Sequence, residues 1–338
     1  MSIKQYILAI ETSCDDTSIA VIDTDYHVYA NIISSQPDHE AFGGVYPELA
    51  SRLHLRNLPA CVEAALHKSG LTLKDMSAIA VSVNPGLIGS LVVGVSYAKA
   101  LAWSLDIPLV AVNHMFGHVM AIKIEHPELN PPWLSLVVSG GHTEIVIFNT
   151  LDDFYILGQT LDDASGEAFD KIAKLLDLGF PGGPIIDKLA KTGNPNLIKF
   201  PRALDKKDNF NFSFSGLKTS VLNWVEKQTP EYIQTNLNDI VASIQMAIVE
   251  ILVKKTTNAA IIQKMNKIIV AGGVSANSCL RAEMQKKCTS LNIDVYFPKM
   301  QYCMDNAAMI GSAAIQKFKN KEFADLRLNA FSTKGTKL

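Results

Sequence analysis

Apolar segments along the chain alternate between short runs typical of strands and longer periodic runs typical of helices. The segments "YILAIE" and "SIAVID" flank a polar turn near the start of the sequence, and they predict a β-hairpin. The segment "WLSLVVSGGHTEIVIF" repeats the same order of apolar strand, small polar turn and apolar strand. This repetition indicates two lobes that are built on one plan.

Longer segments with helical character lie between these strands and fill much of the second half. Residues 46–70 predict a helix that Pro59 kinks or breaks and that Gly70 ends. Residues 239–265 predict a long, mostly apolar helix, and a final helix is expected at about residues 305–320. The alternation of strands and helices predicts an α/β protein of two lobes with a cleft between them.

One segment has the apolar character of a membrane span. Residues 78–98 contain no charged side chain, but their middle carries Asn84-Pro85-Gly86. Asparagine, proline and glycine in this order favour a turn, which would break a spanning helix. We therefore predict a buried strand, a turn and a buried helix, and no membrane association.

Composition narrows the class of protein further. The chain has 338 residues, of which 48% are hydrophobic, and two lobes of ordinary size fit this length well. A net charge of -2 does not by itself indicate nucleic-acid binding, although a local basic patch is compatible with that total. Five cysteines without C-x-x-C spacing, and a start without a signal-peptide pattern, predict reduced thiols in a cytoplasmic protein.

The first candidate for chemistry is the histidine pair in "VNHMFGHVMA". His114 and His118 stand four residues apart, so a helix would place both imidazoles on one face, where they can share a metal ion. A zinc protease of the zincin type would carry glutamate directly after the first histidine, but Met115 occupies that position. The segment therefore lacks a base for hydrolysis. By spacing alone, two helix-surface histidines explain the pair equally well.

Glycine turns form a second group of candidates. They occur in "VVSGGHTE", in "DLGFPGGP" and in "AGGVSAN", next to predicted strands or helices. Glycines let backbone N–H groups approach a phosphate closely, and a helix N-terminus favours anions. Each turn alone also fits ordinary architecture, and the dinucleotide pattern G-x-G-x-x-G is absent. Together the turns indicate a nucleotide site.

Carboxylates are the third group. Asp15 and Asp16 lie in the polar turn "ETSCDDT", and Asp305 lies in "YCMDNAAM" at the entrance to the last predicted helix. Asp305 fits two roles, an N-cap or a third metal ligand beside His114 and His118. A set of two histidines and one carboxylate leaves coordination positions open for a substrate and suits iron or zinc.

A basic neighbourhood follows in the second half. Alternating phenylalanines and polar residues in "FNFSFSGLKTSV" favour a β-ribbon with one apolar face. The most basic part of the chain lies around it, as either a phosphate-binding surface or a solvated loop. Its cations are Lys199, Arg202, Lys206, Lys207 and Lys218.

The motifs taken together resemble a known family. The chain resembles the bacterial TsaD type of tRNA threonylcarbamoyladenosine transferase, formerly labelled O-sialoglycoprotein endopeptidase. The resemblance covers nearly the whole chain, and the set of motifs is far more specific than any one of them. These motifs are "ETSCDDT", "GGVYPELASR", "NPGLIGSLVVG", "NHMFGH", "VSGGHTE", "ASGEAFDK", "FPGGP", "FNFSFSGLKT", "AGGVSAN" and "MDNAAMI".

The resemblance implies both a fold and a reaction. It implies two related lobes of the actin/Hsp70-like type, which we place at residues 1–112 and 113–304. The final helix is expected to pack back on the first lobe, and the second lobe is expected to carry the metal and nucleotide sites. The implied reaction transfers a threonylcarbamoyl group from threonylcarbamoyl-AMP to N6 of adenosine 37, in tRNAs that read codons beginning with adenosine. AMP leaves.

The resemblance also implies the site residues, the cofactors and the partners. One Fe²⁺, or alternatively Zn²⁺, is expected on His114, His118 and Asp305, and an adenylate-bearing substrate or ATP is expected in the cleft. The implied partners are tRNA, a TsaB-like paralogue, a TsaE-like ATPase and a separate synthase that supplies the donor. The implied substrate-binding residues are Val137, Val138, Ser139, Gly140, Gly141, Asp170, Gly183, Asp187 and Asn277.

The chemistry of such a transfer fits these residues. The donor is a mixed anhydride with a good leaving group and the acceptor amine is a poor nucleophile, so catalysis should rest on positioning and on charge stabilisation. Asp15 or Asp16 could relay the amine proton. The alternative is an actin-like small-molecule kinase or ATPase, which would use the same glycine turns. Such enzymes bind Mg²⁺ through carboxylates and water and need no histidine pair.

Overall fold

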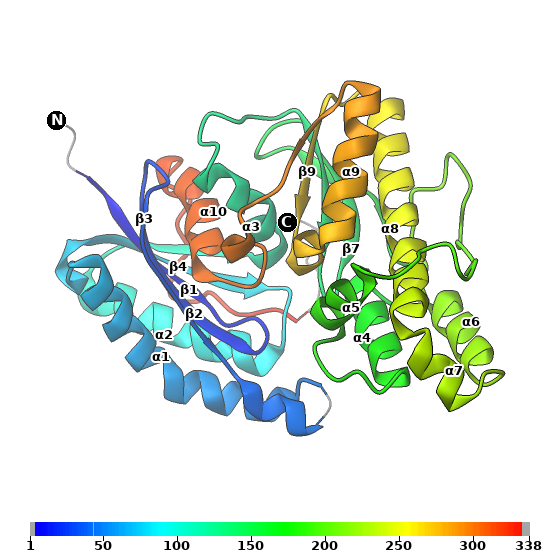
Figure 1. Cartoon of the computed structure of the whole chain (residues 1–338). Helices are drawn as coiled ribbons and strands as arrows, with labels where there is room; N and C mark the ends of the chain where they lie inside the picture. Colours follow the sequence, from blue (N-terminus) through cyan, green and yellow to red (C-terminus); the bar gives the residue numbers. More distant parts are fainter. Residues whose placement is uncertain (1–3, 43, 333–338) are drawn as a thin grey trace. The chain divides into compact units, whose positions relative to one another are not determined.

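The computed structural model describes residues 4–42 and 44–332, which fall into two compact units. Unit 1 comprises Met1–Leu129 and Pro298–Leu338, and unit 2 comprises Asn130–Phe297. Each unit contains a five-stranded sheet with helices packed on it (Figure 1), which confirms the α/β prediction. The division differs from the expected boundaries, since residues 113–129 and 298–304 belong to unit 1.

The two sheets share one topology. Their strand orders are β3-β2-β1-β4-β5 and β8-β7-β6-β9-β10, and in both sheets the first three strands pair antiparallel and the last three parallel. The repeated hairpin in the sequence is therefore one part of a repeated sheet. The strands of unit 1 are β1 (Tyr6–Glu11), β2 (Asp16–Asp23), β3 (Val28–Ser35), β4 (Met76–Asn84) and β5 (Leu109–Asn113). Those of unit 2 are β6 (Trp133–Val138), β7 (Thr143–Phe148), β8 (Phe154–Gln159), β9 (Lys267–Ala271) and β10 (Asp294–Tyr296).

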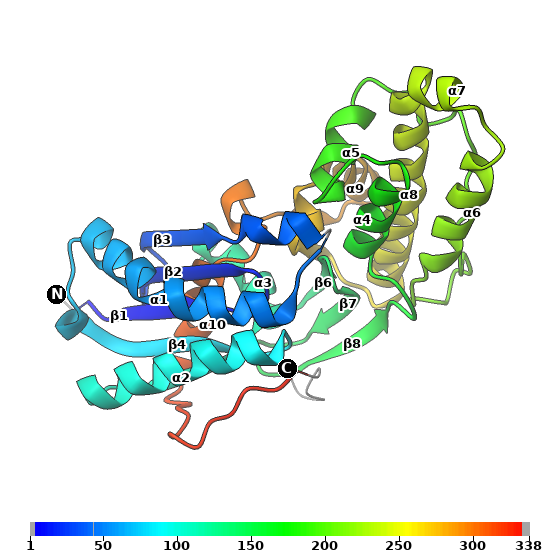
Figure 2. The same ribbon diagram turned by 90° about the horizontal axis from the view of Figure 1, so that it is seen from below.

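Helices cover both faces of the first sheet (Figure 2). Helices α1 (Pro47–Ser69) and α2 (Ile88–Leu105) pack on one face, against Leu8 and Ile10 of β1. Helix α10 (Ala307–Lys319) packs on the other face, where its Gly311 approaches Ala9. Alternate residues of β1 thus enter opposite layers, as the period of a strand requires.

Two local predictions in unit 1 can be compared with the structure. β4, the Asn84-Pro85-Gly86 turn and α2 follow one another as the sequence predicts. Helix α2 is long and apolar enough to cross a membrane. This is weak evidence for a membrane span, because core helices of soluble proteins can have the same length and composition. Helix α1 runs through Pro59 in one piece and ends at Gly70, whose φ is 70°. The carbonyl group that Pro59 leaves without a donor belongs to Leu55, which is exposed to water.

The remaining helices belong mostly to unit 2. The predicted β-ribbon around Phe212 is largely absent, because that residue makes one bridge with Thr160 and a helix then begins at Ser215. The helices are α3 (His114–Met120, unit 1), α4 (Ser165–Leu175), α5 (Gly182–Ala190), α6 (Ser215–Val225), α7 (Pro230–Thr235), α8 (Leu237–Ile262) and α9 (Ser278–Leu291). Short 3-10 helices are η1 (Pro37–Phe42), η2 (Leu73–Asp75), η3 (Ala121–Ile124), η4 (Gly273–Ala276) and η5 (Met300–Tyr302).

Candidate functional site

The histidine pair lies on a short helix inside unit 1. Asn113 begins α3, because its side-chain oxygen accepts a hydrogen bond from the backbone N–H of Phe116 at 3.0 Å. The helix brings the rings of His114 and His118 to a centroid distance of 4.7 Å. Their exposed fractions are 6% and 1%, so the interpretation as two surface histidines is wrong.

Asp305 completes a group of three ligand atoms. Its Oδ1 lies 3.5 Å from Nε2 of His114 and 3.1 Å from Nε2 of His118, and the three ligand atoms all lie within 4.8 Å of one another. Asp305 is not the N-cap of α10, because the side chain of Asn306 takes that role by accepting from the N–H of Met309. The carboxylate therefore stays directed towards the histidines.

Close packing of α10 on α3 holds Asp305 in place. A side chain at Gly117 would approach Ile310 within 2.9 Å, so glycine at this position lets the two helices come close. Ser312 donates a hydrogen bond to the carbonyl oxygen of Met120 at 2.6 Å. At the other end, Ser18 of β2 accepts from the N–H of Ala307 at 2.8 Å. Residues far apart in sequence are thus fixed together.

The chemistry of this group fits a divalent transition metal. Both histidines can offer Nε2 and the aspartate an oxygen, which is the donor set of iron and zinc sites with open positions. The Nε2 atom of His118 is buried and makes no hydrogen bond within residues 4–42 and 44–332, and the polar atom that faces it is Oδ1 of Asp305 at 3.1 Å. A buried ring nitrogen without a hydrogen-bond partner is costly, and coordination of a metal ion would remove that cost.

Glu11 is a further candidate residue of the site, and the sequence interpretation missed it. It is fully buried at the end of β1, and its Oε2 lies 3.0 Å from Nδ1 of His114. Its other oxygen accepts from the N–H of Ser13 at 2.5 Å, and the Ser13 hydroxyl lies 3.0 Å from the same Nδ1. This arrangement places the ring proton on Nδ1 and leaves Nε2 free to bind a metal. A charged residue at the end of an apolar strand, in "LAIETS", was the available signal.

The carboxylates around His114 also affect its charge. Burial lowers the pKa of His114, but the negative charges of Glu11 and Asp305 outweigh burial and raise that pKa to about 9. Without a metal the ring is therefore protonated on both nitrogens and positively charged at neutral pH. A metal ion would compete with that proton for the ring.

The polar turn that carries Asp15 and Asp16 is tied to α1. His54 of that helix is fully buried; its Nε2 lies 2.9 Å from the carbonyl oxygen of Cys14 and its Nδ1 lies 2.8 Å from the Thr17 hydroxyl. Burial raises the pKa of Asp16 to about 6, and the charges of Asp305 and Asp15 add to this effect. A carboxyl group with such a pKa can exchange protons near neutral pH.

The residues expected to bind the substrate lie in unit 2, and contacts link several of them. The turn after β6 closes when the N–H of Ser139 donates to the carbonyl oxygen of His142 at 2.8 Å. The N–H of Gly166, at the start of α4, donates to the carbonyl oxygen of Ser139. Further along α4, Asp170 accepts from the N–H of Gly182 at 2.7 Å, and burial raises its pKa. The first two glycine turns therefore both contact α4, the first at its start and the second at its middle.

The third glycine turn joins the same region through α5. Asp187 of α5 accepts hydrogen bonds from the hydroxyl and the backbone N–H of Ser278, at 2.8 and 3.1 Å. Asn277 is the N-cap of α9, because its Oδ1 accepts from the N–H of Leu280. Its amide nitrogen donates to Gln245 at 2.8 Å. The amide of Asn277 is thus already engaged within the protein, a structural role that the sequence did not indicate.

Comparisons with known proteins agree on one family. Residues 27–312 match the family model described as "TsaD: tRNA N6-adenosine threonylcarbamoyltransferase". A tRNA N6-adenosine threonylcarbamoyltransferase of Clostridium perfringens (strain SM101 / Type A) is 50% identical over 328 residues, which are 97% of this chain and 97% of the relative. One of Clostridium botulinum (strain 657 / Type Ba4) is 49% identical over 325 residues, 96% of each chain.

Solved structures with low sequence identity share the fold. The crystal structure of HypF from T. kodakarensis matches with a TM-score of 0.64 and 14% identity, covering 97% of this chain and 50% of that chain. Component A of (R)-2-hydroxyglutaryl-CoA dehydratase from Acidaminococcus fermentans matches with a TM-score of 0.56 and 13% identity, covering 93% and 98%. These likenesses concern the fold alone, and they confirm the predicted actin/Hsp70-like class.

Proposed function

The chain belongs to the TsaD family, the tRNA N6-adenosine threonylcarbamoyltransferases, and we propose which of its residues serve each part of this transfer. The enzyme is an acyltransferase that acts on tRNA. In our proposal the donor is threonylcarbamoyl-AMP, supplied by a separate synthase. The acceptor is N6 of adenosine 37 in tRNAs that read codons beginning with adenosine, and AMP is released.

The metal part of the proposal rests on one observation. Nε2 of His114, Nε2 of His118 and Oδ1 of Asp305 converge, and the His118 nitrogen has no hydrogen bond within the described residues. These residues would hold one Fe²⁺ or Zn²⁺ ion. When bound, the ion supplies positive charge that stabilises negative charge on the donor. Glu11 orients the His114 ring and so presets the geometry of the site.

The nucleotide part of the proposal rests on glycines that packing does not explain. A Cβ atom at Gly140, Gly141 or Gly183 would meet no protein atom within 4 Å. Bare backbone facing open space suits close approach by a phosphate or a ribose. We assign these glycines, with Asp170 and Asp187, to the adenylate of the donor. Val137, Val138, Ser139 and Asn277 support the same region, because they shape the strand end and the helix start beside it.

The proton of the acceptor amine needs a base. In the transfer, N6 forms a bond to the carbamoyl carbon, the bond from that carbon to the phosphate oxygen breaks, and one proton leaves N6. We assign that proton to Asp15 or Asp16 in the turn after β1. The raised pKa of Asp16, about 6, supports this role, because a base with a pKa near the working pH transfers protons efficiently.

The partner part of the proposal concerns the outer face of α2. Ile88, Val92 and Trp103 are exposed on it by 49%, 47% and 75%. We propose that this face contacts a TsaB-like paralogue, since burial of apolar side chains is what stabilises a protein interface. A TsaE-like ATPase would act with this pair. The assembly is proposed to work in the cytoplasm, without a membrane.

A reconstitution experiment tests the proposed reaction. The purified protein is combined with the paralogue, the ATPase, threonylcarbamoyl-AMP and an unmodified tRNA, and the tRNA is then digested to nucleosides. We expect threonylcarbamoyladenosine at position 37, with little product when the partners are left out. ATP-dependent phosphorylation of a small molecule, without any tRNA product, would instead support the kinase alternative.

A further inference from the structure

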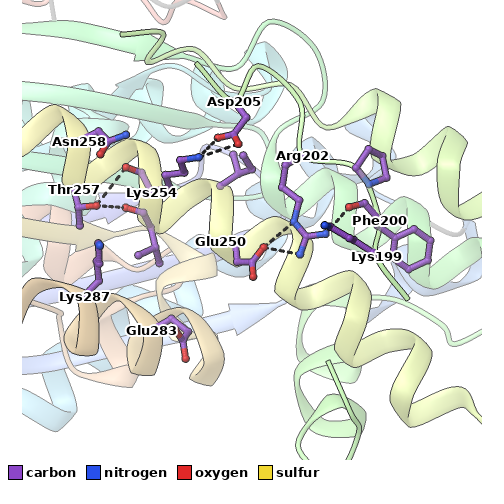
Figure 3. Close-up of a pocket in the computed structure, with 13 residues that line it drawn as sticks. Lys199, Phe200, Arg202, Asp205, Glu250, Lys254, Thr257, Asn258, Glu283 and Lys287 are labelled. Atoms are coloured by element: carbon purple, nitrogen blue, oxygen red, sulfur yellow. Dashed lines mark hydrogen bonds and ion pairs between the residues drawn. The ribbon is translucent and has the colours of Figure 1, made fainter. Parts of the chain in front are cut away.

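Unit 2 contains a groove whose lining includes none of the residues assigned above. It runs along α8 between the 199–205 segment and α9, and has a volume of about 750 Å³ (Figure 3). We call it the α8–α9 groove. Four cations line it, which are Lys199, Arg202, Lys254 and Lys287.

Acidic residues of the groove are partly neutralised by these cations. Arg202 donates from Nε to Glu250 at 2.7 Å, and Lys254 forms an ion pair with Asp205 at 2.7 Å. Both pairs join the 199–205 segment to α8, as the dashed lines in Figure 3 show. The buried Lys255 adds a hydrogen bond to the carbonyl oxygen of Leu204 at 2.7 Å. This wall of the groove is therefore held firmly in place.

The lysines that form no ion pair give the groove its excess positive charge. Lys199 and Lys287 have no ion-pair partner within residues 4–42 and 44–332, and both are exposed. Four positive and three negative side chains line the groove, a net charge of 4 − 3 = +1 in a chain whose total is -2. The positive ones are Lys199, Arg202, Lys254 and Lys287, and the negative ones are Asp205, Glu250 and Glu283. Three more lysines, Lys206, Lys255 and Lys286, stand directly next to lining residues in the sequence.

The shape of this charged surface favours a polyanion over a single small anion. From Glu250 to Asn258 the groove follows α8 for about 12 Å at the rise of an α-helix, and its unpaired lysines stand on two separate walls. Lysine ammonium groups contact phosphates as point charges without demanding a fixed geometry. Contacts of this kind position a nucleic acid and do not read its sequence. The substrate of this enzyme is such a polyanion.

We propose that the α8–α9 groove binds the phosphate backbone of the substrate tRNA, with Lys199 and Lys287 as direct contacts. This inference rests on tRNA being the substrate. The groove provides affinity and orientation, and the chemical step takes place elsewhere. An acidic segment of a protein partner would satisfy the same charges, so the experiment separates the two.

The test measures tRNA binding at several salt concentrations with the full chain and its paralogue. The double variant K199Q/K287Q should bind tRNA roughly tenfold more weakly near 0.1 M salt, and the slope of log K against log salt should fall by about two. The KM for tRNA should rise while kcat at saturating tRNA stays unchanged. The charge-preserving variant K199R/K287R should bind as the parent does.

A matched control loses the same charge at other places. Lys74 and Lys227 are exposed, do not line the groove and carry no ion pair in the described part of the chain, so K74Q/K227Q should retain the affinity and salt slope of the parent. Unchanged tRNA affinity in K199Q/K287Q would overturn the proposal. Normal tRNA binding by K199Q/K287Q, combined with loss of the stimulation of tRNA modification by the partner ATPase, would also overturn it. That result would show that the groove binds a protein partner. Failure of the assigned function itself would appear in the parent protein, as absence of tRNA modification.

Discussion

Oε2 of Glu11 and Nδ1 of His114 lie 3.0 Å apart, although 103 positions separate the two residues in the sequence. The carboxylate is fully buried, and in the described part of the chain its side-chain hydrogen bonds are to the His114 ring and to the N–H of Ser13. A carboxylate behind a metal-binding histidine fixes the tautomer and strengthens the ligand. The proposed metal site thus includes Glu11 behind its three proposed ligands.

Replacing this carboxylate should weaken metal binding. Glu11→Gln keeps the size of the side chain but removes its charge, so the affinity for Fe²⁺ or Zn²⁺ should fall about 10- to 100-fold. Metal titration of the purified protein measures this directly, without reference to activity. Ser13→Ala removes an uncharged contact to the same ring and should lower the metal affinity less than Glu11→Gln does. Equal metal affinity in Glu11→Gln and the parent would exclude the orienting role.

Loss of the proposed ligand His118 should reduce metal binding more than loss of the Glu11 charge does. His118→Gln removes an imidazole from the centre, so metal content should fall to a small fraction and tRNA modification should be abolished or sharply reduced. The protein should still fold, because a metal site with open positions is not the main support of a fold. Elemental analysis beside a nucleoside digest checks both expectations.

The control for that variant follows from burial. Met115 stands next to His114 but is only 3% exposed, so Met115→Ala would open a cavity in the core. Met115→Leu conserves volume and removes no ligand, and its metal content and activity should stay normal. A His118→Gln protein with normal metal content and normal activity would refute the assignment of the centre.

Two adjacent glycines allow the nucleotide assignment to be tested. Gly183→Ala places a methyl group in open space, so the free energy of unfolding should stay the same or rise by up to about 1 kcal/mol, while affinity for the adenylate falls. Gly182→Ala would bring a Cβ within 2.4 Å of Ala173 and should destabilise the protein instead. Calorimetric binding of AMP and thermal unfolding separate the two effects. Undiminished AMP binding in Gly183→Ala would count against our assignment.

The buried carboxyl of Asp16 predicts a pH dependence of stability. Its pKa is raised from 3.8 to about 6 by burial, so its contribution to stability is present below pH 4 and is lost as the pH rises through 6. In metal-free protein, Asp16→Asn should therefore be more stable than the parent at pH 8, by on the order of 2 kcal/mol, and equally stable near pH 4. Urea unfolding at both pH values measures this difference. A constant difference across that range would show that the carboxyl does not titrate there.

The exposed face of α2 predicts a partner contact. Trp103→Glu replaces a side chain that is 75% exposed, so the isolated protein should keep its melting temperature. Binding of the paralogue should weaken at least about tenfold, since an exposed aromatic residue is a typical anchor of an interface. Size-exclusion chromatography of the mixed proteins reports the complex. Lys74→Glu, a charge change away from this face, should leave the complex intact.

Local patterns in the sequence determined a large part of this protein. The period of apolar residues predicts β1, β4, α2 and α8, because burial of one face or one segment is decided by residues close together in the chain. The spacing of His114 and His118 predicts their shared helical face for the same reason. Glycines in "VSGGHTE" and "FPGGP" indicate open backbone, and the structure shows open space at Gly140 and Gly183.

Only the tertiary structure decided which residues meet. Asp305 meets His114 and His118 because α10 packs on α3 through Gly117, and no local pattern separates the proposed ligand role from an N-cap. Glu11 reaches His114 because β1 and β5 lie in one sheet with β4 between them. Asn277 engages its amide with Leu280 and Gln245 for the same kind of reason. Distances between residues far apart in the chain are set by packing, and sequence spacing carries no measure of them.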